Sequence, residues 1–223
     1  MARKDGSAGA RGRGANASVK PPAADGPPRV WKPSKQQLAA AYGKTLASVI
    51  GPGLDVLFFG INPSLYSAAV GHHFARPGNR FWPALHRAGF TDRLLSPFED
   101  HLLLAYGCGV SNVVPEATAA ASEVPREAYA AGGRRLLRML EEHRPRFVAV
   151  LGVGAYEAAF ERRGVKVGPQ EERLGPSTLW VLPNPSGLNA NYQLPRLVGL
   201  FSELRAAIAR ATDSRRRTAG GSR

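Results

Sequence analysis

The stretch VLFFGINP, residues 56–63, decides the fold and the place of the functional site. Four apolar residues lead into Gly60, and an amide and a proline follow. A second stretch, LWVLPNPSGLN at residues 179–189, repeats this arrangement of an apolar run and a polar turn. Near-continuous apolar runs are typical of strands buried on both faces of a parallel sheet, and open α/β sheets place ligands at the carboxyl ends of their strands. We therefore expect the function to lie at these two turns.

Short apolar runs alternate with amphipathic segments along most of the chain. The runs predict strands at 55–59, 110–114, 147–151 and 178–182. The amphipathic segments predict helices at 34–47, 79–87, 96–106, 125–143, 155–162 and 193–211. Strands separated by helices indicate a parallel sheet with both faces covered. The expected fold is of the α/β class, a three-layer α/β/α sandwich with a central four-stranded, mainly parallel sheet.

The net charge of +13 and the pI near 10.7 point to a polyanionic partner, with nucleic acid the first expectation. Residues 1–29 and 210–223 each carry a net +4, which leaves only +5 for the chain between them. The first of these segments is rich in Gly, Ala, Pro and Arg and has no hydrophobic periodicity. We expect a disordered basic tail over 1–29, one domain over 30–211 and a second disordered basic tail over 212–223.

The single cysteine, Cys108, excludes a disulfide framework or a cysteine-ligated metal cluster within this chain. No apolar run approaches the roughly 18 residues expected of a membrane helix. The start of the chain lacks the apolar stretch of a secretory signal. We expect a cytoplasmic protein, associated with the nucleoid if the source is bacterial. We also expect a monomer that uses no metal and no organic cofactor.

Three segments match a known family in the same order along the chain: GINP at 60–63, GHHFARPGNRFW at 71–82 and NPSGLN at 184–189. Together they resemble the mismatch-specific uracil/thymine-DNA glycosylases of the uracil-DNA glycosylase superfamily, and the resemblance spans residues 54–205. It implies a glycosidase of base excision repair that acts on double-stranded DNA with G·U or related mismatches. Such an enzyme flips uracil, thymine or a damaged pyrimidine out of the duplex and hydrolyses its N-glycosidic bond.

The resemblance assigns the central roles to three residues. Asn62 matches the asparagine that holds and polarises the attacking water. An amide does not take a proton at neutral pH, so catalysis would depend on positioning and on support of the leaving base anion. Phe74 matches the aromatic residue on which the flipped base stacks, a contact worth ~1–3 kcal/mol per base. Leu188 matches the wedge that fills the vacated stack.

The remaining candidates line the base or contact DNA. Main-chain groups of Gly60 and Ile61 would meet the pyrimidine edge, and His73 would add a donor at the rim. The full set of expected substrate-binding residues is Gly60, Ile61, Pro63, Ser67, His73, Phe74 and Asn184. The expected DNA-contacting residues are Asn79, Arg80, Ser186, Gly187, Leu188 and Asn189, of which the first two would hold a phosphate at a helix start. Asp92 and Glu116 are candidate carboxylate helpers in catalysis.

Three positions depart from the pattern of the family. Ser64 stands where many relatives have glycine, and the bulky Tyr66 precedes Ser67, so the mouth of the pocket is expected to be narrower or differently lined. Ala190 stands where bacterial relatives usually have arginine. This change predicts a weaker reading of the guanine that the flipped base leaves behind.

Other functions remain open at this stage. The highly active uracil-specific branch carries an aspartate in its first motif and a histidine in its second, and the iron–sulfur branches need four cysteines; this chain has neither feature. The motifs hold no lysine, which predicts a monofunctional enzyme that leaves an abasic site. A catalytically weak or inactive binding module for mismatched or abasic DNA is the main alternative. An enzyme for a phosphorylated metabolite is disfavoured because 152–154 lacks the third glycine of a dinucleotide site.

Overall fold

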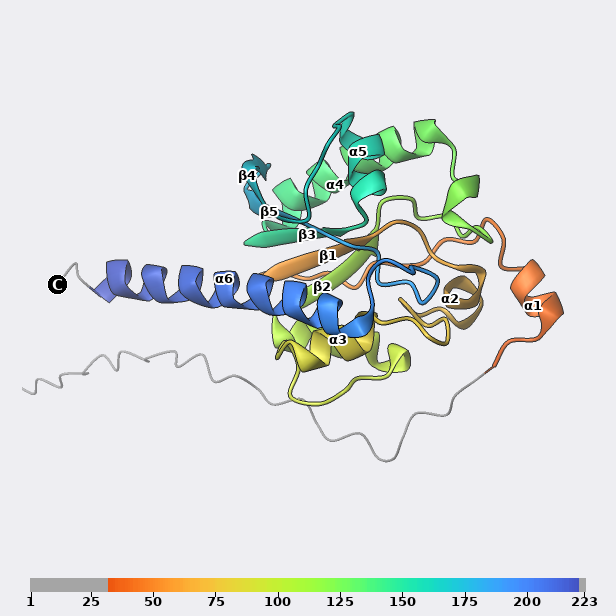
Figure 1. The fold of residues 1–223 in the computed structure, drawn as a ribbon, viewed down its shortest axis with the longest axis horizontal. Coiled ribbons are helices and arrows are strands. Elements are labelled where there is room, and N and C mark those ends of the chain that lie inside the picture. The colour runs from red at the N-terminus through yellow and green to blue at the C-terminus, as the bar shows by residue number, and fades with distance from the viewer. Residues whose placement is uncertain (1–31, 221–223) are drawn as a thin grey trace, which may run out of the picture.

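The computed structural model describes residues 32–220, built around a five-stranded sheet (Figure 1). The strands are β1 (Val56–Gly60), β2 (Cys108–Asn112), β3 (Phe147–Leu151), β4 (Gly168–Leu174) and β5 (Ser177–Leu182). Their order is β2-β1-β3-β5-β4, and all neighbours are parallel except the antiparallel pair β4 and β5. The carboxyl ends of β1, β2, β3 and β5 therefore meet at one edge of the sheet. The tail expected over 1–29 lies outside the described residues.

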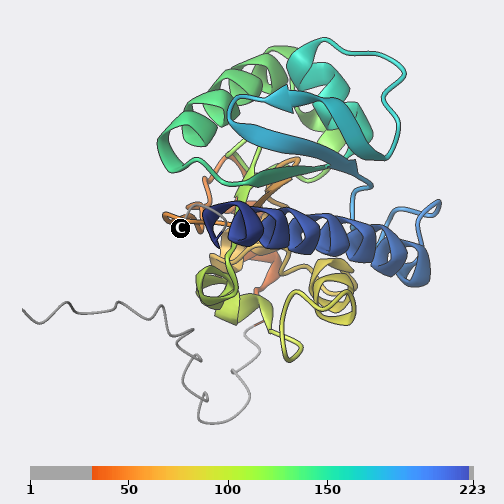
Figure 2. The ribbon, with the colours of Figure 1, turned by 90° about the vertical axis from the view of Figure 1, so that its left-hand side faces the viewer.

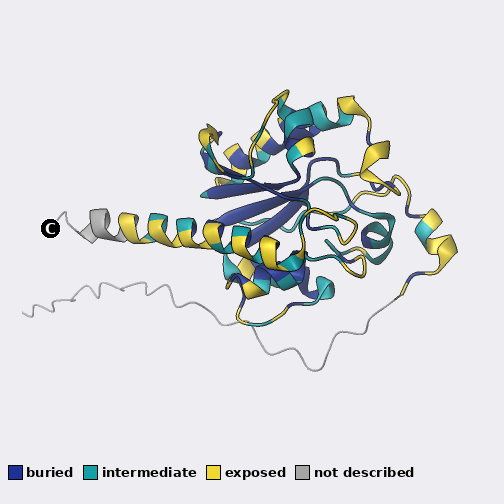
Figure 3. Ribbon diagram, viewed as in Figure 1, coloured by how far each residue is buried: buried dark blue, intermediate teal, exposed yellow. Residues whose placement is uncertain are grey.

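Helices cover both faces of the sheet (Figure 2). They are α1 (Lys35–Ala39), α2 (Leu65–Val70), α3 (Phe81–Arg87), α4 (Arg126–His143), α5 (Val153–Phe160) and α6 (Leu194–Gly220), with 3-10 helices η1 (Pro97–Tyr106) and η2 (Ala121–Glu123). Alternate residues of β1 face opposite layers: Phe58 stacks on Phe201 of α6, whereas Phe59 shares a core cluster with Leu136 of α4. The central strands are buried throughout (Figure 3). The expected three-layer α/β/α sandwich is confirmed.

The sheet has five strands rather than the four expected, because β4 carries no apolar run. Its sequence is GPQEERL, and most of its residues are at least partly exposed. An antiparallel strand at the edge of a sheet can leave one face in water. A search for continuous apolar segments therefore cannot find it.

Three helical segments differ from the sequence expectation. Helix α1 ends at Ala39 instead of residue 47, because Gly43 takes a left-handed φ of 71° and Thr45 pairs with Glu116 in an isolated bridge. Helix α2 lies at residues 65–70, where the sequence analysis predicted no helix. Helix α6 continues to Gly220, so the boundary expected at residue 212 falls within this helix. None of the helices over residues 32–220 is long and apolar enough to span a membrane.

Candidate active site

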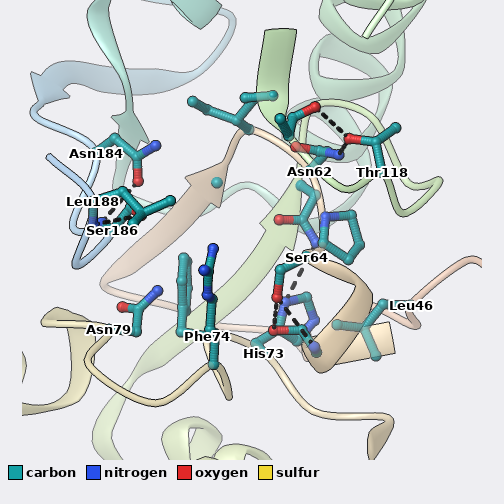
Figure 4. Close-up of a pocket in the computed structure, with 18 of the residues that line it drawn as sticks. Leu46, Asn62, Ser64, His73, Phe74, Asn79, Thr118, Asn184, Ser186 and Leu188 are labelled. Carbon is teal, nitrogen blue, oxygen red and sulfur yellow. Dashed lines mark hydrogen bonds between the residues drawn. The ribbon is translucent and has the colours of Figure 1, made fainter. Parts of the chain in front are cut away.

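A pocket of about 350 Å³ opens at the carboxyl edge of the sheet (Figure 4). The turn after β1 supplies residues 60–63, β2 supplies its last residue, and the loop after β5 supplies Asn184, Ser186 and Leu188. The two motif stretches from which the sequence analysis began therefore face one cavity. The turn after β3 does not line the pocket, and a Cβ at Gly152 would lie 3.0 Å from Ile61 Cδ1.

The side chain of Asn62 is held in one orientation by hydrogen bonds to its nitrogen. Nδ2 donates to Thr118 Oγ1 at 2.7 Å and to the carbonyl oxygen of Glu116 at 3.4 Å. Thr118 Oγ1 donates its own hydrogen to the carbonyl oxygen of Ala120 at 2.7 Å, so toward Asn62 it acts as an acceptor. The amide oxygen of Asn62 is left to accept a hydrogen bond within the pocket. Thr118 also lines the pocket and was missed in the sequence.

Phe74 forms an aromatic wall of the pocket. Its ring stacks on Phe81 with centroids 4.1 Å apart, and it remains only half-buried. The backbone of Phe74 takes a left-handed φ of 53°. The next residue helps to hold this conformation, because Ala75 N donates to Ser67 Oγ at 3.1 Å. A Cβ at Gly60 would lie 2.8 Å from Asn112 Oδ1 and 3.2 Å from Phe74 Cζ, so this close approach favours glycine.

His73 is buried and does not act as a donor at the rim, contrary to the sequence expectation. Only 1% of its surface is exposed, and its Nε2 lies 2.9 Å from the carbonyl oxygen of Ala47. Its backbone N donates to Asp100 Oδ2 at 3.0 Å. Burial lowers the pKa of His73, with a smaller opposing effect from the hydrogen bond to Ala47. The imidazole is therefore neutral at neutral pH.

Asn112 is a second pocket amide, which the sequence analysis did not single out. It ends β2, directly opposite Gly60 in the parallel register, and is 4% exposed. Its Nδ2 lies 3.5 Å from Nδ1 of His73, and a Cβ at Gly60 would lie 2.8 Å from its Oδ1. The available signal was a polar residue at the carboxyl end of a buried strand, the same signal that Asn62 gives.

Several residues expected to bind the base shape the pocket instead of offering free polar groups. The carbonyl oxygens of Gly60 and Ile61 already accept from Val113 N at 2.7 Å and Val114 N at 2.9 Å. Ser67 is buried, and its hydroxyl contacts Ser64 Oγ at 3.1 Å. Pro63 and Asn184 line the cavity as expected.

The loop at 184–189 presents Leu188 to solvent with 74% of its surface exposed. Hydrogen bonds between nearby residues of the loop fix its shape. Asn184 Oδ1 accepts from Ser186 N at 3.0 Å, and Asn189 Nδ2 donates to the carbonyl oxygen of Asn184 at 2.9 Å. Ser186 Oγ accepts from Leu188 N at 3.3 Å. A large apolar side chain is thus displayed on a rigid turn beside the pocket.

Arg80 connects the segment 71–82 to the loop 184–189, whereas the sequence analysis had expected it to hold a phosphate. Its guanidinium donates to three main-chain oxygens, of Gly187 at 3.0 Å, Asn189 at 2.9 Å and Tyr192 at 2.7 Å. Asn79 precedes the N-cap of α3, and its Oδ1 accepts from Phe81 N at 2.9 Å. It also lines the pocket, whereas Arg80 does not.

Neither candidate carboxylate reaches the pocket. Glu116 has an exposed side chain that does not line the cavity, and only its carbonyl oxygen contacts Asn62. Asp92 accepts from Tyr106 Oη at 2.5 Å. Tyr106 ends η1 just before β2 begins, so this contact lies toward the amino edge of the sheet. Among the described residues that line the pocket, the Asn62 amide therefore has no carboxylate beside it.

Two comparisons with known proteins bear on the family of this chain. The family described as the uracil DNA glycosylase superfamily matches residues 47–208. Among solved structures, the chain is similar to the solution NMR structure of "a putative Uracil DNA glycosylase from Methanosarcina acetivorans", with 20% sequence identity and a TM-score of 0.49. That match covers 73% of this chain and 98% of the other. The family match includes every pocket residue from Gly60 to Asn189.

Proposed function

The chain belongs to the uracil DNA glycosylase superfamily, and we propose that it is a monofunctional, mismatch-specific member of it. The superfamily implies a DNA glycosylase, a hydrolase of base excision repair. The proposed substrate is double-stranded DNA with uracil opposite guanine, or with thymine or a damaged pyrimidine in its place. The product is an abasic site in an uncut strand.

The orientation of Asn62 is the observation that carries this proposal. With Nδ2 bound to Thr118, its Oδ1 can accept a hydrogen from a water and direct a lone pair of that water at C1′ of the deoxyribose. The water oxygen forms the new bond to C1′, and the bond from C1′ to the base nitrogen breaks with its electron pair on the base. A water proton is released to solvent or to the departing base, because an amide does not take it up at neutral pH. Positioning and electrostatics supply the rate enhancement.

Binding of the flipped base follows from the walls of the pocket. The exposed face of Phe74 supports stacking worth ~1–3 kcal/mol. The amide of Asn112 lies next to this ring, where the edge of a stacked pyrimidine would lie. The pocket volume of about 350 Å³ is within the range of small-molecule sites.

Leu188 and the absence of a pocket lysine define the rest of the proposal. An exposed apolar side chain on a stiff loop suits insertion between base steps, which compensates for the lost stacking. Unpairing costs less at a mismatch, which favours G·U over A·U.

Among the described residues that line the pocket there is no lysine to form a Schiff base with the sugar, which supports the monofunctional assignment.

The test is base release from labelled duplexes that contain G·U, G·T, A·U or single-stranded uracil, followed by alkaline cleavage of abasic sites. We expect release from G·U at the highest rate, loss of release in Asn62→Ala, and no borohydride-trapped adduct. Retained binding of mismatched or abasic duplex with no release by the wild-type protein would favour a binding module instead.

A further inference from the structure

We propose that Arg76 binds a phosphate that flanks the flipped nucleotide, so that its charge promotes capture of that nucleotide more than general attraction to DNA. The inference rests on the proposed function and gives a binding role to a residue that the sequence analysis did not single out. The partner of Arg76 is a phosphodiester of double-stranded DNA.

Arg76 is the only lysine or arginine among the described residues that line the pocket, and none of those residues is an aspartate or a glutamate. The residue is exposed, and within residues 32–220 its guanidinium has no hydrogen-bond or ion-pair partner. An unpaired cation in a cavity without other formal charges attracts an anionic ligand. Uracil is neutral, so the anionic group that the substrate brings to this cation is a phosphate.

Arg80, in the same segment 71–82, shows the opposite arrangement. Its guanidinium already donates to the main-chain oxygens of Gly187, Asn189 and Tyr192. A guanidinium carries its N–H donors in a planar fork that suits two phosphate oxygens at once. Arg76 has this fork free, whereas Arg80 uses its donors to hold the fold together.

The backbone of Arg76 is fixed by a turn. Asn79 N donates to the carbonyl oxygen of Arg76 at 3.0 Å, which closes a β-turn over residues 76–79. Pro77 occupies its second position, and Gly78 occupies the third with a φ of 82°, as a type II turn requires. The conformational entropy lost when Arg76 binds a phosphate is therefore confined to its side chain.

The turn 76–79 packs against the loop that bears Leu188. A Cβ at Gly187 would lie 2.5 Å from the carbonyl oxygen of Gly78, so the two segments are in close contact. Under the proposed function Leu188 fills the gap that the flipped nucleotide leaves in the duplex. The phosphates on either side of that gap must therefore pass close to this turn, which carries Arg76.

Two neighbours of Arg76 in the pocket have hydrogens left to donate. Asn79 Oδ1 accepts from Phe81 N at 2.9 Å, which leaves its Nδ2 for a ligand. Ser186 Oγ accepts from Leu188 N at 3.3 Å, which leaves its own hydrogen for a ligand. Both residues lie on the side of the pocket that carries Leu188 (Figure 4). Phosphate oxygens are acceptors, so donors beside a guanidinium suit them.

The position of Arg76 in the pocket separates capture of a nucleotide from general binding. In a stacked duplex the phosphates follow the outside of the helix. A nucleotide that swings into the pocket draws its flanking phosphates toward the mouth of that pocket. Removal of the Arg76 charge should therefore weaken the binding of flipped nucleotides and leave the binding of normal duplex nearly unchanged.

The experiment measures binding to three duplexes over a range of salt concentrations. One carries hydrolysis-resistant 2′-fluorinated uridine opposite guanine, one a tetrahydrofuran abasic analogue opposite guanine, and one is fully matched. Arg76→Gln should weaken binding of the first two about tenfold and of the matched duplex less than about twofold. For the first two, the slope of log K against log salt should fall by about 1.

Two further variants serve as controls. Arg76→Lys keeps the charge without the fork, so it should restore the salt slope and part of the affinity. Arg87→Gln removes the same charge from an exposed residue of α3 that does not line the pocket. It should change the binding of all three duplexes by less than about twofold.

Three results would overturn the proposal. An equal loss on the matched duplex would make Arg76 a source of general attraction to DNA. A loss confined to the uridine duplex would show that Arg76 meets the base, because the abasic analogue has the same phosphates and no base. Unchanged binding of all three duplexes would remove Arg76 from the interface. Failure of the wild-type protein to release any base would refute the proposed function, but the abasic and matched duplexes would still decide the inference.

Discussion

Asn62 and Asn112, two of the amides that line the pocket, are each oriented through an intermediate side chain, and the two intermediate side chains differ in their chemistry. Each side-chain nitrogen points at an intermediary that itself donates to a main-chain oxygen: Thr118 to Ala120, and His73 to Ala47. A hydroxyl does not titrate near neutral pH, whereas an imidazole does. We therefore expect the position of the water at Asn62 to be independent of pH over a range in which the selection of the base at Asn112 changes with pH.

Removal of the first amide should have the largest effect. Asn62→Ala deletes the acceptor for the water, and we expect the single-turnover rate of uracil release to fall about 10²–10³-fold. Affinity for G·U duplex should remain within about threefold, because Phe74 and Leu188 are unchanged. Release of uracil by Asn62→Ala at the wild-type rate would exclude Asn62 from the mechanism, and the comparison of its role with that of Asn112 would no longer hold.

The hydroxyl intermediary can be replaced without a change in shape. Thr118→Val removes the acceptor that holds Asn62 Nδ2, so the amide samples both orientations and release should slow about tenfold. Thr118→Ser keeps the oxygen and serves as the matched control. Both variants should show the same pH dependence as the wild-type enzyme. A steeper acid loss in Thr118→Val would contradict the division of roles.

The imidazole intermediary predicts a pH effect on selectivity. Burial lowers the pKa of His73 below its ordinary value of 6.5. Neutral His73 offers Nδ1 as an acceptor to Asn112 Nδ2, so Asn112 Oδ1 can accept from N3–H of uracil, a hydrogen that cytosine lacks. We therefore expect a preference for uridine over cytidine that persists from neutral pH to below 6.5 and falls severalfold as the pH drops through the lowered pKa. Titration of Asn62→Ala protein between about pH 5 and 8 measures it. With Asn112→Ala the preference should be small and flat, and a persistent acid transition there would assign the titration to another group.

The smallest effect is expected at Glu116, whose carbonyl oxygen and not its carboxylate contacts Asn62. Glu116→Gln should change the release rate by less than about twofold, because exposed charges away from the reacting atoms contribute little. Steady-state rates at two salt concentrations give the comparison. A loss near that of Thr118→Val would return a carboxylate to the mechanism.

The sequence predicted those parts of the molecule that depend on residues close together in the chain. Buried strands appear as apolar runs, and Asn62 and Phe74 lie in motifs whose order is specific. Strand β4 has no such run and was missed. The family match supports the superfamily, whereas the roles of these residues stay predictions.

The errors concern partners that are distant in the chain. His73 and Arg80 were interpreted as groups free to meet DNA, but their acceptors lie 26 and more than 100 residues away. Asn112 gave only the general signal of a polar residue at the end of a strand, and Thr118 gave none, because the direction of a hydrogen bond depends on the three-dimensional neighbours. Polar side chains therefore need the folded chain before their roles can be assigned.

The segment 71–82 and the loop 184–189 are in direct contact, which links the movements that each could make. Arg80 ties the loop of Leu188 to the start of α3, and a Cβ at Gly187 would lie only 2.5 Å from the carbonyl oxygen of Gly78. The segment that follows Phe74 and the loop that bears Leu188 are therefore held against each other. Under the proposed function, stacking of the flipped base on Phe74 and filling of the gap by Leu188 would then be coupled, and normal DNA that engages only one of the two segments would gain little.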